Sequence, residues 1–147
     1  RKAAGQVFYD PQYLVIQQYA RLAGARVLES ETISPGYDIA TASDLGLALK
    51  DVPYLDVVAC ERVETGEVVV CAVNRHRHLA LNLSIELQGC VPNGAMWWTY
   101  LADGEITARA RLGDPGRFQL ANGQFAGDST HIQASLLPCS VNWIMLE

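Results

Sequence analysis

Short runs of alternating apolar and polar residues constrain the fold of this chain more than any other sequence feature. The clearest run is residues 80–88, where Leu81, Leu83, Ile85 and Leu87 alternate with polar residues. Side chains on a β-strand point to opposite faces in turn, so this run predicts a strand with one face in the core. Its other face meets water, which is typical of an antiparallel sheet.

Turn-forming residues divide most of the remaining chain into short segments of a similar kind. Their alternating and β-branched residues predict strands, and no helical pattern separates them. Successive strands without intervening helices predict an all-β fold, an antiparallel β-sandwich of jelly-roll type. We expect further strands at residues 26–31, 55–63, 68–74, 95–102, 117–120, 132–136 and 140–146, and a short one near 37–40.

One segment near the start is predicted to be a helix that precedes the sandwich. Asp10 can cap its N-terminus, Pro11 suits the first helical position and Gly24 can close its end. Residues 12–23 are mostly apolar or aromatic, whereas a surface helix usually buries only one face. We therefore expect this helix to be covered on several sides, and part of that cover to come from outside the sandwich.

The segment at 64–67 predicts a hairpin turn between two apolar strands. If Thr65 and Gly66 form a two-residue turn, Cys60 lies directly opposite Cys71, whereas a bulge at Gly66 shifts the register by one residue. Buried, reduced thiols are the favoured interpretation, and a cross-strand disulfide is the alternative. The cysteine spacings match no zinc-site template.

Composition narrows the classes of partner. The net charge of −5 disfavours nucleic-acid binding, and no apolar stretch reaches the ~20 residues that span a bilayer. The chain opens with Arg1 and Lys2 and no signal peptide follows, so we expect it to be a piece of a longer protein. The cellular compartment stays open, with unpatterned cysteines slightly favouring the cytoplasm.

The sequence contains no residue pattern that marks a catalytic centre. It has no Gly-x-Ser-x-Gly elbow, no phosphate-binding glycine loop and no pair of acids that we would nominate for glycoside hydrolysis. His76, His78 and His131 could begin a metal site, but a solvated hairpin tip is the favoured interpretation. We therefore expect no catalytic residue, metal or cofactor in this chain.

The aromatic residues of the strand at 95–102 allow two interpretations. Alternation places Trp97 on one face of the strand and Trp98 and Tyr100 on the other. The favoured interpretation puts one set in the core and the other against a neighbouring domain. The alternative is a carbohydrate-binding module in which Trp98 and Tyr100 form an exposed platform for sugar rings.

The order of four segments resembles the C-terminal part of family fifty-one α-L-arabinofuranosidases. Residues 11–20 resemble the last helix of the family's (β/α)₈ barrel, and 52–59 the entry to its sandwich. Residues 70–75 are similar to a strand that ends in Val-Asn-Arg, and 136–141 to the closing strand, although Cys139 replaces a proline there. The four segments are PQYLVIQQYA, VPYLDVVA, VCAVNR and LLPCSV.

The resemblance implies a division of the chain and a role for it. Residues 1–24 would be the terminal helix of an upstream catalytic barrel, and 25–147 a non-catalytic C-terminal β-sandwich that packs on that barrel and stabilises it. The parent would be a retaining α-L-arabinofuranosidase of L-arabinose metabolism that releases terminal arabinofuranosyl residues from arabinan- or arabinoxylan-type glycans. It could also form homo-oligomers.

No catalytic residue of the family carries over to this chain. The family's acid/base Glu follows an Asn, and no Asn-Glu dipeptide occurs here, while its nucleophile lies upstream on the barrel. The stretch at 101–106 keeps Asp103 but loses the rest of the family's pattern. The parent is therefore expected to be a divergent relative with altered substrate preference, or an inactive one.

Overall fold

The computed structural model describes residues 2–3, 6–7, 9–40, 48–89, 96–105, 108–111, 114, 116–127 and 131–147. Within these residues one helix is followed by antiparallel strands, as the alternation predicted. The elements are β1 (Lys2–Ala3), β2 (Gln6–Val7), α1 (Pro11–Ala20), β3 (Arg26–Val27), β4 (Gly36–Ile39), β5 (Leu49–Pro53), β6 (Leu55–Glu61), β7 (Val68–Asn74), β8 (Leu81–Glu86), β9 (Met96–Ala102), β10 (Ala121–Asn122), β11 (Ala126–Gly127), β12 (His131–Leu136) and β13 (Ser140–Leu146).

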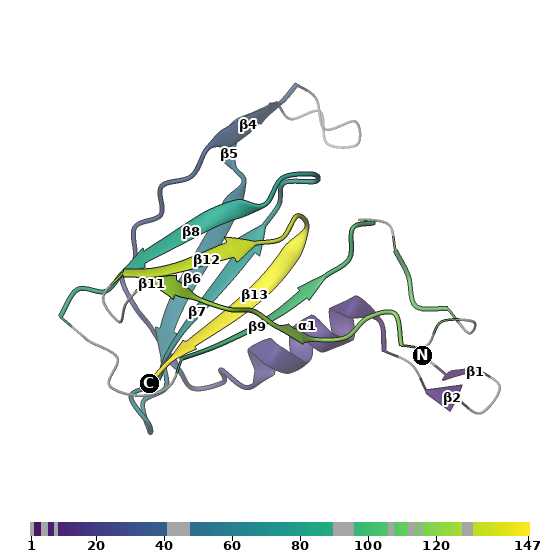
Figure 1. Cartoon of the computed structure of the whole chain (residues 1–147), viewed down its shortest axis with the longest axis horizontal. Helices are drawn as coiled ribbons and strands as arrows, with labels where there is room; N and C mark the ends of the chain where they lie inside the picture. Colours follow the sequence, from purple (N-terminus) through teal and green to yellow (C-terminus); the bar gives the residue numbers. More distant parts are fainter. Residues whose placement is uncertain are drawn as a thin grey trace.

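Two antiparallel sheets form the sandwich (Figure 1). The larger has six strands in the order β10-β9-β13-β7-β6-β3, and the smaller has three in the order β11-β12-β8. Their facing side chains make one core, with Ile132 and Leu136 from the smaller sheet packed against Val70, Ile144 and their neighbours. The predicted all-β sandwich with a preceding helix is thus confirmed.

The helix α1 makes a third layer on the opposite face of the six-stranded sheet (Figure 1). Leu14 of α1 packs in a second core with Val69, Cys71 and Trp143 of the sheet. The central strands β7 and β13 are therefore covered on both faces, which explains why their apolar residues run almost without interruption.

Two buried asparagines, Asn74 and Asn142, form hydrogen bonds between strands of the sandwich. The Asn142 amide donates to the Ala72 carbonyl (3.0 Å) and to the Ser140 hydroxyl (2.9 Å), and its oxygen accepts the Trp98 indole N–H (3.1 Å). Asn74 is also fully buried. A buried polar group destabilises a fold unless it is hydrogen-bonded, so these partners let amides occupy the core.

The structure corrects several predicted boundaries. The α1 helix ends at Ala20 and continues as turns to Gly24, whose φ of +84° suits a glycine after a helix. Only residues 26–27 of the first predicted strand are in a sheet, and residues 117–120 form no strand. Near 37–40 the sequence predicted one short strand, and the structure has a two-stranded hairpin of β4 and β5 there.

Both expected registers of the β6–β7 hairpin are wrong. Cys60 pairs with Val69 and Cys71 with Val58, a shift of two residues from the tight-turn register. The loop is longer than expected, because the Arg62 N–H donates to the Glu67 carbonyl (2.9 Å) and closes it. Cys60 and Cys71 lie on the same face as free, buried thiols, in line with the favoured interpretation.

Candidate interaction surface

The two outer faces of this three-layer domain differ sharply in polarity. The outward residues of β8 and β12 in the smaller sheet are polar and exposed, and they face one another in three pairs: Glu86 with His131, Ser84 with Gln133, and Asn82 with Ser135. This is the wet face that the alternation at 80–88 predicted. The smaller sheet therefore presents a surface suited to water.

The opposite outer face is formed by α1 and carries apolar side chains. Ile16 is 67% exposed and Tyr13 48%, and Ala20 is exposed beside them. Tyr9, just before the helix, stacks on Tyr13 with ring centroids 4.8 Å apart and is also half-exposed. We call Tyr9, Tyr13, Ile16 and Ala20 the α1 surface. The sequence predicted that part of the cover of this helix comes from outside the sandwich. The residues that the structure describes leave the α1 surface uncovered.

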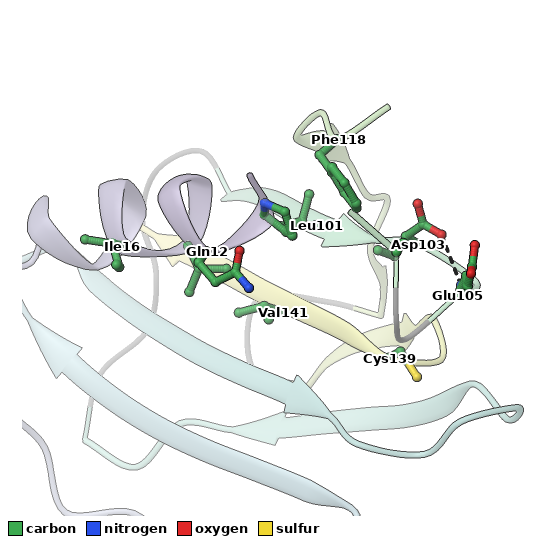
Figure 2. Close-up of a pocket in the computed structure, with 12 residues that line it drawn as sticks. Gln12, Ile16, Leu101, Asp103, Glu105, Phe118, Cys139 and Val141 are labelled. Carbon is green, nitrogen blue, oxygen red and sulfur yellow. Dashed lines mark hydrogen bonds between the residues drawn. The ribbon is translucent and has the colours of Figure 1, made fainter. Parts of the chain in front are cut away.

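A groove of about 430 Å³ runs beside the α1 surface, between the helix and the ends of β9 and β13 (Figure 2). Ile16 of the helix borders it, Leu101 and Val141 form part of its floor, and Phe118 lines its far side. We call this the α1 groove. Its walls are mainly hydrocarbon, so it suits an apolar side chain of a partner more than a charged ligand.

Charged residues hold one wall of the α1 groove. Arg117 contacts Asp103 through Nε (2.7 Å) and Nη2 (3.0 Å), and the same Nη2 contacts Glu105 (2.9 Å). The hydrogen bonds from Arg117 lower the pKa of Asp103, and those carboxylates raise the pKa of Arg117. One guanidinium binds both carboxylates, so this cluster fixes the wall of the groove.

Titratable groups in the contact between α1 and the six-stranded sheet are held in their neutral forms. Burial is the main cause that raises the pKa of the Cys71 thiol to about 12, and the nearby Cys60 raises it further. Burial likewise raises the pKa of Tyr19, which hydrogen-bonds to Cys71, to about 12. A thiolate is the reactive form of cysteine, so these thiols act here as small packed hydrophobes.

The aromatic residues of β9 divide as alternation predicted, but the exposed member is not the one nominated for a sugar platform. Trp98 is only 6% exposed and belongs to the core between the sheets, where it contacts Phe125. Tyr100 lies beside it at 5.6 Å between centroids and is partly buried. Trp97, on the other face, is 44% exposed. Trp98 and Tyr100 therefore form no open platform in this structure.

The histidine-rich segment after β7 forms a loop held by its own side chain. The Nδ1 atom of His76 accepts hydrogen bonds from the backbone N–H groups of His78 (3.1 Å) and Leu79 (2.9 Å). Its ring packs on Tyr54 at 4.6 Å between centroids. His131 lies on β12, and the described residues bring together no group of three or more potential metal ligands.

Comparison with known proteins identifies the fold. No protein-family model and no curated protein matches the sequence. Among solved structures, the GH51 arabinofuranosidase from Xanthomonas axonopodis pv. citri matches 99% of this chain with a TM-score of 0.82 and 16% identity. The α-L-arabinofuranosidase from Thermotoga maritima, solved as an arabinose complex, matches 82% with a TM-score of 0.70 and 19% identity.

These likenesses define the class of domain: a helix-plus-sandwich unit of the kind found in GH51 arabinofuranosidases. The resemblance inferred from the sequence is confirmed at the level of the fold. The matched region is 28% of the Xanthomonas chain and 25% of the Thermotoga chain, so this chain spans about a quarter of their length. Among the helices that the structure describes, none is long and apolar enough to cross a membrane.

Proposed function

We propose that this chain is a non-catalytic β-sandwich domain that packs on, and stabilises, the catalytic (β/α)₈ barrel of an α-L-arabinofuranosidase-like glycoside hydrolase. In this proposal residues 1–24 are the last helix of that barrel and residues 25–147 are the sandwich. The parent would be a retaining enzyme that releases terminal α-L-arabinofuranosyl residues. The main support is the contrast between the apolar α1 surface and the polar outer face of the smaller sheet.

The α1 surface is more stable when a partner domain covers it than when it is exposed to water. Covering the exposed two-thirds of Ile16 stabilises a complex by about 1–2 kcal/mol, and Tyr9, Tyr13 and the α1 groove extend the apolar area. A contiguous exposed apolar surface of this kind usually marks an interaction site. The similar solved chains are several times longer than the matched region, which supports a companion within the same polypeptide.

The test compares one substitution in two contexts. We expect Ile16→Lys to change the melting temperature of the isolated 147-residue chain by no more than about 2 °C, because the side chain is already mostly in water. In the polypeptide encoded by the whole reading frame, the same change should lower the melting temperature clearly more, because it places an ammonium group in an apolar contact.

Gln133→Lys is the matched control, since it adds the same charge to an exposed position of β12 on the polar outer face of the smaller sheet. Equal effects of the two substitutions in the longer polypeptide would contradict docking through the α1 surface. If Ile16→Lys instead dissociates a dimer of the isolated chain in sedimentation experiments, the occupant is a second copy. Turnover of 4-nitrophenyl α-L-arabinofuranoside by the purified isolated chain would overturn the non-catalytic assignment.

A further inference from the structure

A second hollow lies at the edge of the six-stranded sheet, away from the α1 groove. It measures about 250 Å³ and is bordered by Trp97, Thr99, Asn122, Phe125 and Met145, among others. Leu101, in the floor of the α1 groove, is four residues further along β9 than Trp97, about 13 Å at the usual rise of a strand. We call this second hollow the Trp97 cup. It shares no lining residue with the α1 groove.

The strand registers place an aromatic ring and two polar groups on one face of the cup. Trp97 lies opposite Met145, and Thr99 lies opposite both Trp143 and Asn122. Residues directly opposite one another in a sheet share a face, so Trp97, Thr99 and Asn122 project to the same side. Trp97 keeps 44% of its surface exposed there.

The polar groups beside Trp97 are available to a ligand. Neither the Thr99 hydroxyl nor the Asn122 amide forms a side-chain hydrogen bond to another residue in the part of the chain that the structure describes. An amide and a hydroxyl together offer donors and acceptors to hydroxyl groups of a ligand. None of the described residues that line the cup is charged, which favours a neutral ligand.

The wall behind Trp97 is fixed by packing. The backbone N–H of Gly123 donates to the Trp98 carbonyl (2.8 Å), and a Cβ at this glycine would lie 2.0 Å from the Trp98 ring. Only glycine therefore lets the chain cross so closely over Trp98. The Trp98 indole is itself held by Asn142, so the cup is formed before any ligand binds.

From these features we infer that the Trp97 cup binds one neutral sugar residue of a glycan. A sugar ring presents an apolar face that packs on an indole and hydroxyl groups at its rim that can reach Thr99 and Asn122. The cup is smaller than pockets that enclose drug-sized ligands, which suits a single ring. The inference does not depend on docking through the α1 surface, and it moves the aromatic platform from Trp98 and Tyr100 to Trp97.

The test is an NMR titration of the 147-residue chain with arabino-oligosaccharides and xylo-oligosaccharides. The three tryptophans give separate indole N–H signals. That of Trp97 should shift most, because Trp98 and Trp143 are buried and the Trp98 N–H is bonded to Asn142. One ring in a shallow cup corresponds to a Kd of about 1 mM. Polygalacturonate oligosaccharides serve as the charged comparison and should bind more weakly.

Variants assign the signal to the cup. The Trp97 variants lack the reporter indole, so their binding is followed through the backbone amide signals of Thr99 and Asn122. Trp97→Ala should weaken binding at least about tenfold and Asn122→Ala about fivefold, while Trp97→Phe keeps part of the affinity. Leu79→Ala removes an exposed apolar side chain elsewhere and should change nothing. A sharp, well-dispersed Trp143 indole signal in the variants would show that the fold is intact. No Trp97 shift at about ten times the expected Kd, or equal binding by Trp97→Ala, would overturn the inference.

Discussion

Replacement of Asn74 by alanine should destabilise the sandwich far more than the loss of one exposed amide. Asn74 ends β7, and its amide donates to the carbonyls of Leu79 (3.0 Å), Leu136 (3.0 Å) and Leu137 (2.9 Å). Its oxygen accepts the backbone N–H of His76 (2.8 Å). The amide has two hydrogens for three acceptors, so it ties β7 to two separate segments at once.

The expected loss follows from the groups that remain unpaired in Asn74→Ala. Leu137 keeps a hydrogen bond from the Ser140 hydroxyl (2.7 Å), but the Leu136 carbonyl, in a fully buried residue, loses this donor. A buried polar group without a partner costs about 1–3 kcal/mol. The N–H of His76 is partly accessible to water and adds a smaller term, so we expect a total of roughly 3 kcal/mol.

Urea unfolding followed by tryptophan fluorescence measures this difference, because the buried Trp98 and Trp143 report loss of the core. Asn82→Ala is the matched control: it removes the same side chain from an exposed position of β8 and should cost less than about 0.5 kcal/mol. The reasoning fails if the two variants differ by less than about 1 kcal/mol with unchanged m-values.

Three further predictions use the same chain. Leu83→Ala should lower the unfolding free energy by about 2–5 kcal/mol in urea, because it leaves a cavity between the sheets. In the native protein at pH 8, peptide mapping after brief iodoacetamide treatment should find Cys139 alkylated before the buried Cys71, whose pKa is about 12. Arg117→Gln should destabilise the protein at pH 7, and the difference from the parent sequence should shrink toward pH 3. The pKa of Asp103 is lower in the folded state, so its ion pair stabilises above the unfolded pKa of about 4 and is lost as pH falls through the folded value.

The strands and their faces were predictable because alternation is a local property. Leu83 is buried and Asn82 exposed, as the pattern at 80–88 required, and β12 alternates in the same way. Their partner sheet supplies a single apolar layer, so one face of each strand had to be wet. The lone helix was also predictable, since Pro11 and the absence of turn residues inside it are local signals.

Features that depend on distant packing were not predictable in the same way. Alternation separates Trp97 from Trp98, but both faces of β9 meet a core, and only the path of α1 leaves Trp97 partly exposed. The register at Cys60 depends on how the loop at 63–66 closes, which turn propensities alone do not decide. The interaction surface is visible only when α1 is placed on the sheet.

The order of strands also has a consequence for how the chain acquires its structure during synthesis. Strand β13 lies between β7 and β9, so it joins two parts of the larger sheet that were translated well before it. The Asn142 amide reaches Ala72, 70 residues earlier, and such distant pairings form slowly. Until residues 140–146 leave the ribosome, both halves expose an unpaired edge, and a chaperone that shields such edges would act in that interval.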